Sequence, residues 1–255
     1  MGNTERRARA QFDADAWERD WQARPQPVAP VLYLMASTIR TDPVASVLDR
    51  LFALSQREDP LAKDRLIQRE AALGRRLTQI ERYEIYGEAP PLAISREVGR
   101  LIHLLAASRP PHRIVEFGAS HGISAIHLAA AIRDAGEGSL ITTEVLPAKA
   151  KATRENLGAA GLDDLVDVRV GDALQTLRNL GQDVDLLFLD GRNDLYLQVL
   201  ALIEPRLARS CLVVADLSHD DPDLAPYLAH IRNPDGQYDS ICLPLDAGIE
   251  VSVLR

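Results

Sequence analysis

The stretch that decides the fold is VEFGASHGIS, residues 115–124. An apolar run ends at Phe117, a turn bounded by Gly118 and Gly122 follows, and the chain continues as SAIHLAAAI. Glycine lets a strand turn sharply into a helix, and the backbone N–H groups near the helix N-terminus favour a ligand there. The pattern therefore predicts a strand–turn–helix unit that holds a nucleotide-like cofactor, without selecting which one.

Outward from this unit, short apolar runs alternate with amphipathic segments. Predicted strands occupy residues 113–117, 139–144, 166–170, 184–190 and 211–216, and helices begin near Ile123, Ala148, Ala173, Leu195 and Asp221. Strands that are each followed by a helix indicate a parallel sheet with helices on both faces. Residues 238–245 and 248–255 are further strands joined by a DAG loop, which predicts an antiparallel C-terminal hairpin. The predicted fold is α/β and Rossmann-like, with a seven-stranded, mostly parallel sheet.

The N-terminal part of the chain is organised differently. It opens with a charged arm, and two Asp-Pro pairs follow at 42–43 and 59–60. Because Asp-Pro is typical of a helix start, a separate helix is predicted from each pair, the second running to Tyr83. We therefore divide the chain into residues 1–90, an arm and helical region that covers the active site or forms a dimer contact, and residues 91–255, the cofactor-binding domain.

Composition limits the class of partner. The chain has 29 basic and 37 acidic residues and a net charge of −8, which argues against a nucleic-acid backbone as the main partner. No apolar run approaches the roughly 18 residues of a membrane span, and the N-terminus lacks the apolar core of a secretory signal. We therefore expect a cytoplasmic protein without a membrane partner. Cys211 and Cys242 lie in apolar, strand-like runs, so both are predicted to be buried thiols.

Two classes of enzyme use a turn of this kind. A NAD(P)-dependent short-chain dehydrogenase needs a Tyr-x-x-x-Lys pair, and none of the 6 tyrosines has a lysine four residues later. Glu116, just before the turn, can hold the ammonium of a methionine moiety but would repel a pyrophosphate. Glu144, at the end of the second predicted strand, can accept both hydroxyls of a ribose, although NAD enzymes share this feature. These residues favour S-adenosylmethionine.

Residues from about 90 to 255 resemble the catechol and caffeoyl-CoA type O-methyltransferases, a branch of the class I S-adenosylmethionine-dependent methyltransferases. The matching pieces, in order, are VEFGASHGISAIHLA, ITTEVLPAKAKATRENLGAAGL, VRVGDAL, VDLLFLDGRNDLYLQVL, CLVVADLS and LPLDAGIEVSVLR. The resemblance implies the class I methyltransferase fold. It also implies an enzyme that transfers a methyl group from S-adenosylmethionine to a small molecule. The expected acceptor group is a hydroxyl, and a nitrogen or an activated carbon are the alternatives.

The resemblance further implies roles for individual residues. Ser124 would hold the carboxylate of the cofactor's methionine part, Glu144 the ribose, Asp172 and Ala173 the adenine, and Asp190 would lie beside the sulfonium. The complete implied cofactor set is Glu116, Gly118, Ala119, Ser120, Gly122, Ser124, Glu144, Asp172, Ala173 and Asp190. Alternatives are a helix N-cap for Asp172 and a first-turn capping hydroxyl for Ser124.

Many relatives hold Mg²⁺ with three oxygen ligands, an Asp after the fourth strand and an Asp-Asn pair after the fifth. Asp190 and Asp216 match, but Leu217 replaces the Asn, and leucine cannot coordinate a hard cation. Asn193 stands where relatives place a lysine that assists deprotonation of the acceptor, and Arg192 adds a fixed positive charge beside it. We therefore predict methyl transfer without a metal ion. Mg²⁺ stays an alternative that these substitutions disfavour.

Without a metal ion, a side chain must take the proton of the acceptor. The candidates near the carboxyl ends of the strands are Asp190, Asp216, His219 and His121, and we assign catalysis to Asp190 and His219. For both histidines, an ordinary loop residue is the alternative interpretation.

Three segments, residues 30–37, 86–94 and 190–196, are predicted to shape the acceptor pocket. A homodimer is expected as the assembly. Two alternative functions stay open, a cofactor-binding partner subunit that has lost catalysis and the short-chain dehydrogenase, which the missing Tyr/Lys pair disfavours.

Overall fold

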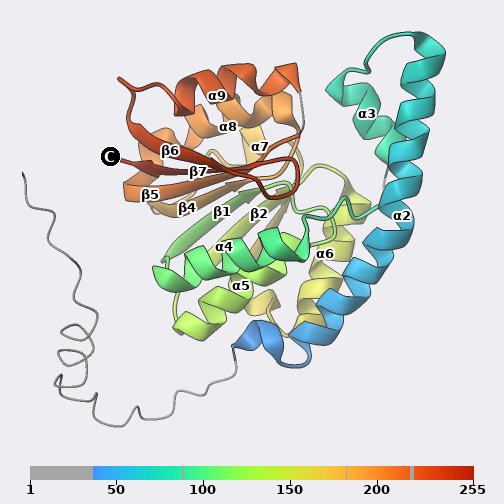
Figure 1. The fold of residues 1–255 in the computed structure, drawn as a ribbon. Coiled ribbons are helices and arrows are strands. Elements are labelled where there is room, and N and C mark those ends of the chain that lie inside the picture. The colour runs from blue at the N-terminus through green and yellow to red at the C-terminus, as the bar shows by residue number, and fades with distance from the viewer. Residues whose placement is uncertain (1–36, 88, 182, 219–220) are drawn as a thin grey trace, which may run out of the picture. The chain divides into compact units, whose positions relative to one another are not determined.

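The computed structural model describes residues 37–87, 89–181, 183–218 and 221–255. Residues 37–255 form one compact unit, drawn in colour in Figure 1. The predicted N-terminal arm, most of the segment 30–37 and the candidate base His219 lie outside the described residues.

The described residues form a seven-stranded sheet of order β3-β2-β1-β4-β5-β7-β6. Its strands are β1 (Arg113–Phe117), β2 (Ser139–Glu144), β3 (Val166–Val170), β4 (Val184–Leu189), β5 (Leu207–Asp216), β6 (Tyr238–Leu243) and β7 (Ile249–Leu254). Strands β1 to β5 are parallel, whereas β7 pairs antiparallel with β5 and with β6. The predicted α/β, Rossmann-like fold with an antiparallel C-terminal hairpin is confirmed.

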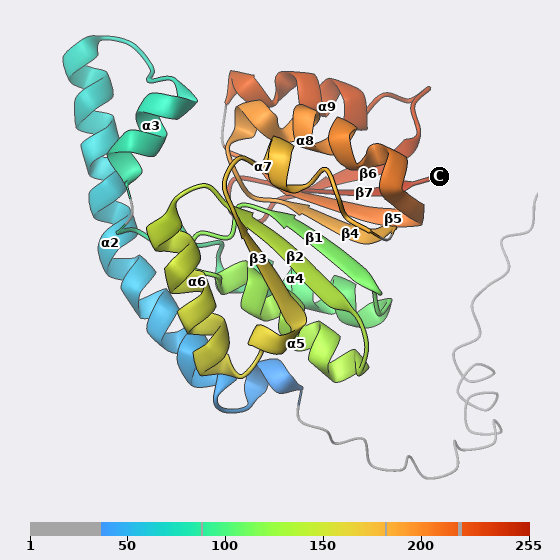
Figure 2. The same cartoon turned by 180° about the vertical axis from the view of Figure 1, so that it is seen from behind.

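Helices cover both faces of this sheet, as Figures 1 and 2 show from opposite sides. One face carries α4 (Arg96–Ser108), α5 (Ile123–Ala135) and α6 (Pro147–Ala160), and the other carries α7 (Ala173–Thr176), α8 (Tyr196–Ile203) and α9 (Ala225–Ile231). Short 3₁₀ turns connect the elements: η1 (Thr38–Arg40), η2 (Asp163–Leu165), η3 (Asn193–Leu195), η4 (Glu204–Arg206) and η5 (Pro222–Leu224). Alternate residues of β1 enter the two cores, Ile114 on the α5 side and Val115 and Phe117 on the α8 side.

The helical region before the sheet differs from the prediction. Helix α2 (Val44–Leu73) runs straight through Pro60, where a new helix was predicted, and α3 (Gln79–Tyr86) is separate. Pro60 lacks an N–H for the preceding turn, but Asp59 and Ala62 beside it are buried, and α2 packs against α3, α5 and α6, so tertiary contacts support the helix. The predicted cap Asp59 is instead buried, and its carboxylate accepts hydrogen bonds from the backbone N–H groups of Leu92 (2.8 Å) and Ala93 (3.0 Å).

The two cysteines differ in burial. Cys211 of β5 is buried as predicted, but the prediction is wrong for Cys242, which is exposed because it lies on the edge strand β6. Among the residues that the structure describes, no helix is both long enough and apolar enough to cross a lipid bilayer.

Candidate active site

A cavity of about 430 Å³ opens at the carboxyl ends of the parallel strands. Its wall includes residues that directly follow five strands: Gly118 and Ser120 after β1, Val145 after β2, Gly171 to Ala173 after β3, Asp190 to Asn193 after β4, and Ser218 after β5. The sheet order changes direction at β1, between β2 and β4. Ligands of open α/β sheets bind at such a switch point, so the cavity lies where the fold predicts a ligand.

The turn after β1 is held against both neighbouring strands. The N–H groups of Gly118 and Ala119 donate to the Thr143 carbonyl at 3.2 and 2.9 Å, and the Asp190 N–H donates to the Phe117 carbonyl at 2.8 Å. Gly118 has φ +102°, and a Cβ atom there would lie 2.4 Å from the Asp190 carbonyl oxygen. The glycine is therefore required both by its backbone conformation and by the close approach of β4.

Glu116 lies beneath this turn, fully buried. The Thr142 hydroxyl donates to its Oε2, whereas its Oε1 has no hydrogen-bond partner among the described residues. Burial raises the pKa of Glu116 to about 7, against the lowering effect of hydrogen bonds from Ser124 and Thr142. Of the implied cofactor set, Glu116, Ala119, Gly122 and Ser124 are not among the described residues that line the cavity, so their contact with a cofactor stays a prediction.

Glu144, the last residue of β2, is the hydrogen-bonding centre of the cavity wall. Its Oε2 accepts the Ser120 N–H at 2.9 Å, and its Oε1 accepts the Leu146 N–H at 2.9 Å and the Tyr83 hydroxyl at 2.8 Å. Asp172 also lines the cavity, and its side chain caps α7 by accepting the Leu174 N–H at 2.9 Å. The N-cap role that the sequence left open for Asp172 is therefore present in the structure.

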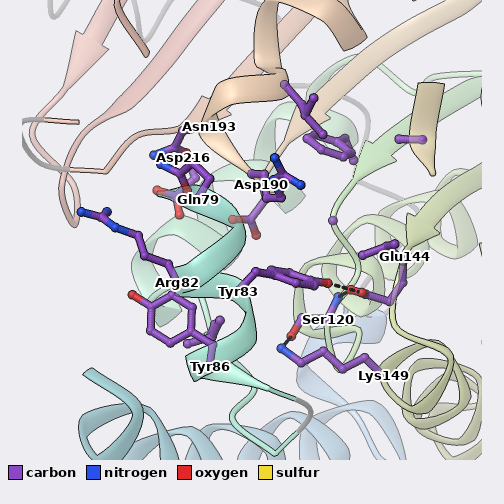
Figure 3. A pocket seen from close by; sticks show the side chains of 18 of the residues that line it. Gln79, Arg82, Tyr83, Tyr86, Ser120, Glu144, Lys149, Asp190, Asn193 and Asp216 are labelled. Atoms are coloured by element: carbon purple, nitrogen blue, oxygen red, sulfur yellow. Dashed lines mark hydrogen bonds between the residues drawn. The ribbon is translucent and has the colours of Figure 1, made fainter. Parts of the chain in front are cut away.

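Asp190 and Asp216 follow β4 and end β5, and both carboxyls enter the cavity wall (Figure 3). Burial and the repulsion of Asp216 raise the pKa of Asp190 well above its ordinary value. Burial and the charge of Asp246 raise the pKa of Asp216 to about 7. Asp216 Oδ1 is buried and has no hydrogen-bond partner among the described residues.

The residues around this pair do not fit the three-ligand Mg²⁺ site that the resemblance implies. Leu217 is buried, and its N–H donates to the Gly248 carbonyl at 2.9 Å. Asn193 is also buried, and its amide donates to Asp221 Oδ2 at 2.8 Å. No group of three Asp, Glu, His or Cys side chains suited to a metal ion occurs in the described part of the chain. Among the described residues, the protein ligand set thus ends at the carboxylates of Asp190 and Asp216, without the third protein oxygen that the metal-dependent relatives supply.

Helix α3 also forms part of the cavity wall (Figure 3). Its last residue, Tyr86, lies in the predicted segment 86–94, but Gln79, Arg82 and Tyr83 were not predicted as individual site residues. Gln79 donates to Asp221 Oδ2 at 2.7 Å, and Arg82 pairs with Glu70 at 3.1 Å. The cavity is also lined by Tyr83 and Tyr86 of α3, Asp59 and Lys63 of α2, and Lys149 of α6. The sequence does carry a signal for α3, because Gly74 is a typical helix stop and Thr78-x-x-Glu81 forms a capping box.

His121 does not join the cavity wall, although it lies in the turn. It is buried, and burial lowers its pKa to about 4. A histidine that stays neutral and enclosed is a weak candidate for a base that must reach an acceptor.

A family model described as a methyltransferase domain matches residues 115–217. Residues 115–217 therefore resemble a methyltransferase domain, and the seven-stranded sheet with a cavity at its switch point agrees with this resemblance.

Individual relatives agree with this class. The catechol O-methyltransferase of Mycobacterium tuberculosis is 42% identical over 105 residues, which cover 40% of this chain and 46% of that protein. The solved structure of cofactor-bound Rv0187 from MTB is 27% identical, with a TM-score of 0.59 over 65% of this chain and 83% of that one. The O-methyltransferase TomG from Streptomyces achromogenes, solved in complex with SAM, is 25% identical, with a TM-score of 0.58 over 65% and 82%. The matched segment spans about half the length of the first curated relative.

Proposed function

We propose that this chain transfers a methyl group from S-adenosylmethionine to a hydroxyl of a small-molecule acceptor. The observation that carries the proposal is the cavity itself, whose wall brings together the Gly118 turn, Glu144 and the carboxyls of Asp190 and Asp216. The similarity to proteins described as O-methyltransferases, one of them solved with SAM, supports the same activity.

The cavity residues fit this cofactor. Gly118 and Ser120 place the turn in the cavity wall, Glu144 offers carboxylate oxygens that could accept the hydroxyls of a ribose, and Asp172 and Ala173 also line the cavity. Glu116, with its unpartnered Oε1 beneath the turn, would favour the ammonium of the amino-acid tail from behind. Ser124 would serve the tail's carboxylate. When bound, the cofactor supplies an electrophilic methyl group on a sulfonium.

The remaining chemistry belongs to residues of this chain. The pair of carboxyls of Asp190 and Asp216 would accept the single proton of the acceptor hydroxyl. The surrounding cavity wall would align the acceptor oxygen for in-line attack on the methyl group, and this alignment supplies much of the rate. His219 stays a second candidate base. Residues 37–90 would act as the cap of a domain that spans residues 91–255, because α2 and α3 line the cavity. The expectations of a cytoplasmic location and of a homodimer stay predictions.

We expect methyl transfer to proceed without a metal ion. Leu217 and Asn193 remove the third oxygen ligand and the lysine of the metal-dependent relatives, and both side chains are committed elsewhere. Activity should therefore change less than about twofold in excess EDTA, since a modest base and good alignment suffice for this displacement. Loss of activity in EDTA with rescue by Mg²⁺ would show that the two carboxylates hold a metal ion after all.

The activity is tested with a panel of phenols, catechols, aliphatic alcohols and amines, by following S-adenosylhomocysteine formation with the full chain. The expected result is formation of S-adenosylhomocysteine with a hydroxyl acceptor, and no oxidation of NADH. Tight cofactor binding with no turnover on any acceptor would favour a partner subunit that has lost catalysis.

A further inference from the structure

A side chain of helix α3 is hydrogen-bonded to Glu144, the carboxylate that would bind the ribose of the proposed cofactor. Figure 3 shows the ring of Tyr83 reaching across the cavity from α3 to Glu144 at its far wall. The Tyr83 hydroxyl donates to Glu144 Oε1 at 2.8 Å, and the ring is about half-buried between the two walls. A protein hydroxyl thus stands where the proposed function places a hydroxyl of the ribose.

Glu144 does not have enough hydrogen-bond acceptor positions for both the Tyr83 hydroxyl and the two hydroxyls of a ribose. A carboxylate offers about four lone-pair positions, two on each oxygen. On Oε1, Tyr83 and the Leu146 N–H take both positions, and on Oε2 the Ser120 N–H takes one. The two backbone donors belong to the fold of the turn and of the α6 start and cannot leave without unfolding it. A ribose that brings two hydroxyl donors therefore finds one open position and needs the one that Tyr83 holds.

We propose that Tyr83 is a positioning residue that competes with the cofactor's ribose for Glu144 and thereby sets the affinity for the cofactor and for its product. The inference rests on the proposed function, because it concerns the same cavity. Cofactor entry turns the Tyr83 hydroxyl off Glu144, and departure of the product lets it return.

The anchors of α3 show how this exchange can occur without loss of the cap. Gln79 and Arg82, on the side of the helix that meets Asp221 and Glu70, hold α3 at the opposite wall. Asp221 also accepts the Asn193 amide at 2.8 Å, so this anchor is tied to the loop after β4. None of these bonds involves Glu144. The Tyr83 side chain can therefore leave while the helix stays in place.

The expected size of the effect follows from the strength of the bond that must break. When the binding-competent state is only a fraction of the population, the apparent dissociation constant rises by the inverse of that fraction. One hydrogen bond of ordinary net strength corresponds to about a threefold to tenfold factor. Removing the Tyr83 hydroxyl should tighten cofactor binding by that factor.

The test is calorimetric titration of the full chain with S-adenosylhomocysteine, comparing wild type, Tyr83→Phe and a matched control. The control is Tyr238→Phe, which removes a Tyr-to-Glu hydrogen bond of 2.9 Å to Glu204, a residue outside the cavity lining. We expect Tyr83→Phe to lower the Kd about threefold to tenfold and Tyr238→Phe to leave it unchanged. The KM for S-adenosylmethionine should fall with the Kd.

A second titration uses the 2′,3′-dideoxy analogue of S-adenosylhomocysteine, which has no ribose hydroxyl to compete for Glu144. We expect Tyr83→Phe to leave the Kd of this analogue unchanged, so that the gain appears only with the natural ribose. A merely structural role of Tyr83 would move both ligands alike. If Tyr83→Phe fails to fold, a crystal structure of wild type with S-adenosylhomocysteine decides, because the Tyr83 hydroxyl should then lie beyond hydrogen-bond distance of Glu144.

Several results would overturn the inference while leaving the proposed function intact. These are weaker or unchanged binding in Tyr83→Phe, an equal gain for the dideoxy analogue, an equal gain in Tyr238→Phe, or a crystal structure in which Tyr83 still donates to Glu144. If wild type and Tyr83→Phe both fail to bind S-adenosylhomocysteine, the proposed function itself fails and the inference with it.

Discussion

Replacing Gly118 by alanine is expected to weaken S-adenosylhomocysteine binding by about 100-fold and to lower the melting temperature. The residue has φ +102°, a conformation that strains any side chain, and the new Cβ would lie 2.4 Å from the Asp190 carbonyl oxygen. Backbone atoms on both sides cannot yield as a flexible side chain would, so the turn must shift, at a cost of about 2–5 kcal/mol. Titration calorimetry and thermal melting measure the two effects.

The matched control is Gly161→Ala. This glycine ends α6 with φ +68°, and a Cβ there would meet no atom within 4 Å. It should cost about 1 kcal/mol of stability, from backbone strain alone, and leave the Kd for S-adenosylhomocysteine unchanged. If Gly118→Ala retained wild-type affinity, the turn after β1 would not be the cofactor site.

Replacing Glu116 by glutamine should stabilise the protein increasingly as the pH rises. Burial raises the pKa of Glu116 to about 7 in the folded protein, against the ordinary value of 4.5. The folded state therefore binds an extra proton between these values, and wild type loses stability as the pH rises from 4.5 to about 7. Glutamine has no charge to bury, so the free energy of unfolding of the variant minus that of wild type should grow by about 3 kcal/mol across this window.

Chemical denaturation at pH 4.5, 6 and 8 measures this difference. The lowest pH serves as the internal control, because there the wild-type carboxyl is largely protonated in the folded protein and the gap should be smallest. A gap that stays constant, or that shrinks toward pH 8, would contradict the assignment of Glu116 as a carboxyl buried without enough hydrogen-bond donors.

The sheet and the strand-end residues could be predicted because local signals determine them. A parallel sheet covered on both faces needs strands that are apolar on both sides, and these stand out as short uninterrupted runs. Once the strands are placed, the residues after them must meet at one edge of the sheet. Gly118, Glu144 and Asp190 were placed in the site on this basis, and the structure brings all three to the cavity wall.

The rest of the site depends on contacts between segments far apart in the chain. Tyr83 reaches Glu144 only because α3 folds back over the carboxyl edge of the sheet, and no local pattern gives that path. Helix α2 continues past Pro60 because its tertiary contacts, with α3 as well as with α5 and α6, outweigh a strong local stop signal. The burial of Glu116 could be predicted in part. Side chains alternate along β1, so Glu116 lies on the face opposite to Phe117, which is the face covered by α5.

The central claim is that the cavity at the carboxyl edge binds an adenosyl cofactor with an amino-acid tail. Calorimetric titration of the wild-type chain with S-adenosylhomocysteine and, separately, with NADH tests it most directly. One molecule of S-adenosylhomocysteine bound per chain, with no heat from NADH, is the predicted result. Saturable binding of NADH, or no binding of S-adenosylhomocysteine at millimolar concentration, would contradict it.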